Sequence, residues 1–135
     1  MYVTLDEADI YLESVMVTEA WDLSTDVLRT KSIKAAQKII EALNTIGTLD
    51  EAGDPVALIK DATVEIALKL LDGVDPEAEL YNYTIKEMEF DRLKQTNKSG
   101  ETPLHVIAGV PSVIAFNILR RYMPDITTVR LSRTD

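Results

Sequence analysis

The sequence has no cysteine, a single histidine and only five glycines among its 135 residues. A chain without cysteine can form neither a disulfide framework nor a thiolate zinc site. The five glycines stand apart from one another, so neither glycine-rich phosphate-binding fingerprint is present. These shortages exclude disulfide-stapled and zinc-thiolate domains and leave no motif for binding a nucleotide.

The chain also lacks an apolar run long enough to cross a bilayer. Its most apolar stretch, 103–119, is interrupted by Gly109 and Pro111 and falls short of the roughly 20 residues that a spanning helix needs. Met1 is followed by an acidic amphipathic segment, unlike the basic and then apolar start of a secretory signal. We therefore expect one soluble domain with 103–119 in its core and no membrane contact.

Basic residues are scarce in the first part of the chain. Residues 1–79 hold 17 acidic and 6 basic side chains, whereas residues 80–135 hold 6 acidic and 8 basic ones, and the whole chain carries a net charge of −9. An acidic body repels nucleic acid, because non-specific binding depends on Lys and Arg that neutralise phosphates. The mildly basic C-terminal part is better suited to an acidic partner.

The pattern that is present is helical. Residues 4–7, Thr-Leu-Asp-Glu, have the spacing of a capping box and predict a first helix close to the N-terminus. Trp21 follows in a short helical turn and is expected to anchor the core. Ser24 or Thr25 then caps a long amphipathic helix, which we expect Gly47 to end.

A second long helix is predicted to start at Asp54-Pro55 and to end before Gly73. It is apolar over most of its circumference, which favours a central position among the other helices. Asp61 and Glu65 share its narrow polar stripe, and we expect that stripe to be exposed.

The period changes after this helix. Alternating residues predict a β-hairpin near 83–109, with 103–109 as its return strand, and Ser112 then begins another helix. We therefore predict a mainly α fold: a small bundle of about four to five helices in residues 1–125, with the hairpin as an insertion, followed by an extended arm at 126–135.

No constellation of residues supports catalysis, a metal or a cofactor. His105 lies in an apolar run beside Pro103, Leu104 and Val106, which favours a structural or surface role over catalysis. The acidic stretch 72–79 does not follow the ligand order of an EF-hand loop. We therefore expect no enzyme activity. Two small basic patches could contact single-stranded DNA by charge and stacking, although helix C-terminal cations and a solvated loop are the favoured interpretation. They are Arg92, Lys94 and Lys98 in a loop, and Arg120, Arg121, Arg130 and Arg133 near the end.

The order of these signals resembles the head–tail connector (adaptor or head-completion) proteins of tailed bacteriophages, a group also labelled DnaT-like single-stranded-DNA-binding. The likeness covers residues 2–73. It rests on "YVTLDEADIYLES", "AW", "LSTDVLRTKSIKAAQKIIEALNTIG" and "VALIKDATVEIALKLLDG", and it returns in "VPSVIAFNILRRYMP" and "TTVRLSRTD".

The resemblance implies a structural virion protein, present in the host cytoplasm during assembly. It would form a dodecameric ring beneath the portal, extend the DNA channel and hold the next neck or tail-completion protein. A net-negative channel lets double-stranded DNA pass without specific binding. The arm carries Arg130, Leu131 and Arg133, which suit an acidic groove on the portal, and we predict that it is the portal-binding element.

Two other functions stay open. A single-stranded-DNA-binding module would rely on Arg92, Lys94 and Lys98, and its affinity would fall steeply with salt. A small scaffold domain would bind protein partners through the apolar run 103–119 and would form a stable small oligomer by itself.

Overall fold

The computed structural model describes residues 1–43, 45–82 and 103–123, and these residues form a helical domain. The mainly α prediction is confirmed. The described helices are α1 (Leu5–Leu12), α2 (Glu19–Asp22), α3 (Asp26–Ala42), α4 (Ala57–Leu71), α6 (Leu104–Ile107) and α7 (Val113–Leu119), and residues 76–82 are also helical.

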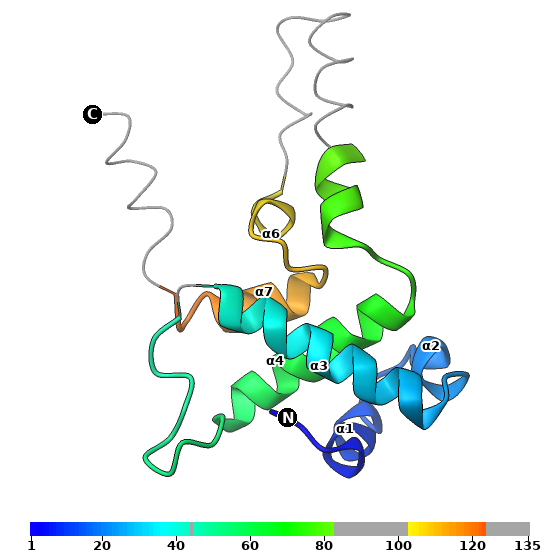
Figure 1. The fold of residues 1–135 in the computed structure, drawn as a ribbon, viewed down its shortest axis with the longest axis horizontal. Helices are drawn as coiled ribbons and strands as arrows, with labels where there is room; N and C mark the ends of the chain where they lie inside the picture. Colours follow the sequence, from blue (N-terminus) through cyan, green and yellow to red (C-terminus); the bar gives the residue numbers. More distant parts are fainter. Residues whose placement is uncertain (44, 83–102, 124–135) are drawn as a thin grey trace, which may run out of the picture.

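Helix α4 is the centre of the domain. It packs against α1, α2, α3 and α7, and Figure 1 shows it crossing behind α3 with α1 below. Its buried residues run without a break from Ala62 to Leu68, with Ile59 one turn earlier. The predicted central position of this helix is confirmed, because a helix that is apolar nearly all round needs neighbours on every side.

Local hydrogen bonds start α1, α3 and α7 as the sequence predicts. At α1 the Thr4 hydroxyl accepts from the backbone N–H of Glu7, while the Glu7 carboxylate accepts from the backbone N–H of Thr4, which completes the capping box. Thr25 caps α3 and Ser112 caps α7 in the same way, through their hydroxyl oxygens. Each cap accepts from a donor that the helix itself leaves unpaired.

Two predicted boundaries of the long helices are wrong. Helix α3 ends at Ala42 rather than at Gly47, and α4 begins at Ala57 with no side-chain cap. The residues between the helices form their own structure: Leu49 pairs with Pro55 in an isolated antiparallel bridge. Pro55 therefore lies in that bridge instead of in the first turn of α4.

The predicted hairpin is not supported. Its return strand, 103–109, is wrong: this segment is the short helix α6, which ends in a turn at Gly109 with a φ of +79°. A short apolar run has no clear period, so a strand and a buried helical turn look alike in the sequence. The other predicted strand lies outside the described residues, as does the arm at 126–135.

Candidate interaction surfaces

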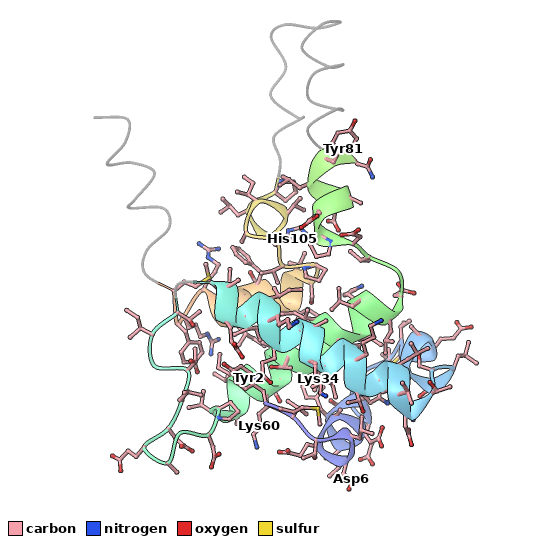
Figure 2. The ribbon with its side chains drawn as sticks, viewed as in Figure 1. Tyr2, Asp6, Lys34, Lys60, Tyr81 and His105 are labelled. Carbon is pink, nitrogen blue, oxygen red and sulfur yellow. The ribbon has the colours of Figure 1, made fainter. Side chains whose placement is uncertain are left out.

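The outer side of α3 is a row of lysines. Val27, Lys31, Lys34 and Lys38 recur at helical spacing on the side away from its buried residues, and all four are exposed. We call them the lysine face. An open groove of about 680 Å³ runs along it, with Ala35 among its lining residues. Figure 2 shows Lys34 near the middle of α3.

This face concentrates positive charge on an acidic body. Four of the six basic residues in 1–79 belong to α3. One of them, Arg29, folds back onto the domain: its Nε donates to the Trp21 carbonyl oxygen at 2.9 Å, and its guanidinium lies 5.3 Å from the Trp21 ring centroid. The three lysines have no such partner, since no carboxylate in the described ranges lies within ion-pair distance of them.

The outer side of α1 has the opposite charge. Asp6, Ile10 and Glu13 lie on the side away from the buried residues of α1, and all three are exposed. We call them the acidic face. Ile10 is 66% exposed between the two carboxylates. Figure 2 shows Asp6 at the lower edge of the molecule, pointing away from the body.

The inner side of α1 is held to α4 by two polar contacts. Lys60 Nζ donates to Glu7 Oε2 at 2.6 Å, and the Tyr11 hydroxyl donates to Glu65 Oε2 at 2.6 Å. The hydrogen bond from Lys60 lowers the pKa of Glu7 and raises the pKa of the lysine itself. Burial, followed by the bond to Glu65, raises the pKa of Tyr11 above its ordinary value.

Glu65 corrects one prediction. The sequence predicts an exposed stripe for it, but Glu65 is only 5% exposed and accepts the Tyr11 hydroxyl. Asp61, one turn earlier, is half-buried, and burial raises its pKa. A pocket of about 340 Å³ beside these residues is lined by Tyr11, Lys60 and Asp61 among others. Because Lys60 bonds to Glu7 and Tyr11 bonds to Glu65, we interpret these two pairs as polar contacts that hold α1 against α4.

His105 has the structural setting that the sequence predicts, with one addition. Its Nε2 lies 3.8 Å from Glu79 Oε1, and its ring lies 6.5 Å from that of Phe116. Figure 2 shows it between α6 and helix 76–82. This contact joins the segments on either side of 83–102.

Two exposed apolar surfaces lie on different parts of the domain. Met16, Val17 and Leu23 flank α2, and we call them the α2 surface; Met16 is 97% exposed. Ile107, Val113 and Ile114 flank the turn from α6 to α7, and we call them the α7 surface. Figure 1 places α2 at the lower right and the α6–α7 turn above α3. Large apolar side chains that are exposed close together along the chain can form a contact surface for another molecule.

Most of the predicted site residues lie outside the part of the chain that the structure describes. The portal-binding residues Arg130, Leu131 and Arg133 lie outside the described residues, as does the basic patch of Arg92, Lys94 and Lys98. Arg120 and Arg121 are described and exposed, and the Arg120 guanidinium lies 5.8 Å from the Phe116 ring centroid.

Sequence reasoning missed the lysine face and the acidic face. The signal was present in both cases. Lys31, Lys34 and Lys38 follow a three–four spacing opposite the apolar stripe of the same helix, and Asp6, Ile10 and Glu13 repeat a four–three spacing. The overall net charge hides the first of these, because it averages a cationic face into an acidic body.

No protein-family model, curated protein or solved structure matches this chain. Within the described residues, no helix combines the length and apolar character needed to cross a membrane. The same residues contain no group of three or more potential ligand side chains that could hold a metal ion.

Proposed function

We propose that this chain is a structural virion protein, a head–tail connector subunit that forms a ring under the portal. The ring extends the DNA channel and joins the head to the next neck or tail-completion protein. The proposal starts from the resemblance of residues 2–73 to phage connectors. The lack of a match to a family model means that it rests on the sequence pattern and the surfaces of the domain.

The observation that carries the proposal is that one small domain has separate exposed apolar surfaces. The α2 surface and the α7 surface come from different elements and differ in composition. A ring subunit contacts its two neighbours through two different surfaces, one for each, and a connector also contacts components above and below it. Several distinct contact surfaces on one domain are what these neighbours require.

The charge of the domain supports the same function. Residues 1–79 have eleven more acidic than basic side chains, so most of the described body repels phosphates. DNA that moves through a channel must not be held, and weak cation contact keeps its counterions in place. The extended arm at 126–135, with Arg130, Leu131 and Arg133, remains our predicted portal contact.

The first test is native mass spectrometry of the protein mixed with the portal encoded in the same genome, together with electron-microscope imaging. We expect a ring stacked on the portal in portal-matching stoichiometry. Deletion of 126–135 should abolish the complex and leave the helical circular-dichroism signal unchanged. A full-length protein that forms no complex would contradict the connector function.

Single-stranded-DNA binding is the second candidate, and the lysine face is the described feature that favours it. Such a module would bind an oligonucleotide with an affinity that falls steeply as the salt concentration rises, and it would not bind the portal. Fluorescence anisotropy across a salt series, run beside the portal experiment, separates the two functions.

A further inference from the structure

We propose that the lysine face of α3 binds the acidic face of α1 from a second copy of this chain. The proposal rests on the proposed function only for the closure of this contact into a ring. The contact itself stands on the spacing, exposure and charge of the two faces. It names the subunit interface, which the resemblance leaves open.

The two faces match in charge. The lysine face presents Lys31, Lys34 and Lys38, and the acidic face presents Asp6 and Glu13. Among the ion pairs of the described residues, none uses any of these five side chains. Each face therefore keeps its charge available for another molecule, and opposite charges across an interface set its partner and its register.

The faces also match in spacing. Asp6 and Glu13 are seven residues apart, as are Lys31 and Lys38. Seven residues of helix span about 10.5 Å, so both carboxylates can meet a lysine at once. When the helices run parallel, Ile10 lies opposite Ala35. An antiparallel pair would place it opposite Lys34 instead, so the apolar match of Ile10 with Ala35 selects the parallel arrangement.

The apolar parts of the faces support the same docking. Ile10 is 66% exposed on its own copy, and the groove on α3 includes Val27 and Ala35 in its lining. The aliphatic stems of the lysines add apolar surface on both sides of the groove. An isoleucine held between two carboxylates fits such a groove better than a phosphate backbone, which has no apolar side chain to bury.

Within a single copy, the lysine face cannot contact the acidic face. Helices α1 and α3 turn their buried sides toward the shared core, so the two faces point away from it in the same molecule. The contact must therefore be made between copies. Because each copy offers one face of each kind, contacts can repeat head to tail, and such a series closes into a ring or continues as a filament.

Cysteine cross-linking tests the contact directly, because the natural chain has no cysteine. Ile10→Cys on one preparation is mixed with Ala35→Cys on another at high protein concentration and low salt, and disulfides are formed with a mild oxidant. The matched control replaces Ile10→Cys with Ile46→Cys, since Ile46 is 69% exposed but lies on neither face. We expect roughly tenfold more heterodimer than in the control, because a disulfide forms only where the two Cα atoms come within about 7 Å.

Charge reversal then identifies the groups that hold the contact. Lys31→Glu with Lys38→Glu on the Ala35→Cys partner should reduce the heterodimer to the control level. Asp6→Lys with Glu13→Lys on the Ile10→Cys partner should restore it. Circular dichroism of each variant verifies that α1 and α3 remain folded. If the first pair is no better than the Ile46 control, or if the double reversal fails to restore the product, the proposal is overturned.

Three further readouts test head-to-tail assembly, the connector function and nucleic-acid binding. A chain with both Ile10→Cys and Ala35→Cys should give a cross-linked ladder beyond the dimer. A product that stops at the dimer overturns head-to-tail assembly. Portal binding of the uncross-linked protein is measured in parallel. Portal binding without the specific cross-link would refute the interface and keep the connector, whereas the cross-link without portal binding would refute the connector.

The last readout is competition by an oligonucleotide. The lysine face would be assigned to nucleic acid instead if the oligonucleotide lowers the cross-link yield, salt-matched buffer does not, and charge reversal fails to restore the product.

Discussion

Helices α3 and α4 are the longest described helices with defined ends, and they use their polar residues in opposite ways. On α4, Thr63 and Glu65 are buried and form hydrogen bonds inside the domain. On α3, the three lysines lie opposite the buried side and form no ion pair with any described residue. Thr63 and Glu65 of α4 therefore hold the fold, whereas the three lysines of α3 are available to a partner.

The largest effect that this comparison predicts is at Ile66 of α4, which is completely buried. Ile66→Asp loses core packing and buries an unpaired carboxylate, so we expect a loss of more than about 5 kcal/mol, enough to unfold a typical domain. Thermal melting followed by circular dichroism measures it. Lys69→Asp, on the exposed edge of the same helix, is the control, with an expected loss of no more than about 1 kcal/mol. A near-native melt for Ile66→Asp would remove α4 from the centre of the fold.

The central position of α4 could be predicted because it follows from the composition of the helix alone. The helix starts at Thr4, Thr25 and Ser112 could also be predicted, since a cap is a hydrogen bond across three residues. The predicted start of α4 at Asp54-Pro55 was wrong because the residues before the helix are positioned by a bridge, in which Leu49 pairs with Pro55. Tertiary contacts of this kind override a local start signal.

The burial of Glu65 could not be predicted from the sequence of α4 alone. Its partner, Tyr11, lies 54 residues away, and only the packing of α1 on α4 brings the two together. The lysine face and the acidic face could have been predicted, because exposure opposite an apolar stripe follows from helical spacing. What the sequence does not contain is the pairing of one face with the other, which involves a second molecule.

An intermediate effect is expected at Tyr11, where a side chain of α1 satisfies a buried carboxylate of α4. Tyr11→Phe keeps the ring and removes the hydroxyl that donates to Glu65, so we expect a loss of about 1–3 kcal/mol at neutral pH. Urea denaturation measures the change. Tyr81→Phe, on an exposed tyrosine of helix 76–82, should change stability by less than about 0.5 kcal/mol.

The same tyrosine predicts a dependence on alkaline pH. Because the pKa of Tyr11 is raised in the folded state, the unfolded chain loses its proton first as pH rises above about 10. The contribution of Tyr11 to stability should be constant below that pH and should fall above it. Tyr2, whose pKa burial also raises, contributes to the same loss. Tyr11→Phe should therefore weaken the alkaline loss without abolishing it, and an unchanged slope would place the Tyr11–Glu65 contact in doubt.

The smallest effect on stability is expected where the two helices differ most, on the lysine face. Replacing Lys31, Lys34 and Lys38 together with Ala removes three exposed charges and adds three strong helix formers, so each site should change stability by no more than about 0.5 kcal/mol. The self-association measured by cross-linking should nevertheless disappear, and a matched triple replacement with Arg should retain it, since guanidinium groups also pair with carboxylates. A large drop in melting temperature for the Ala variant would mean that the lysines hold the fold, as the polar residues of α4 do. The contrast between the two helices would then fail, because a face that the domain needs for its own stability is not available to a second copy.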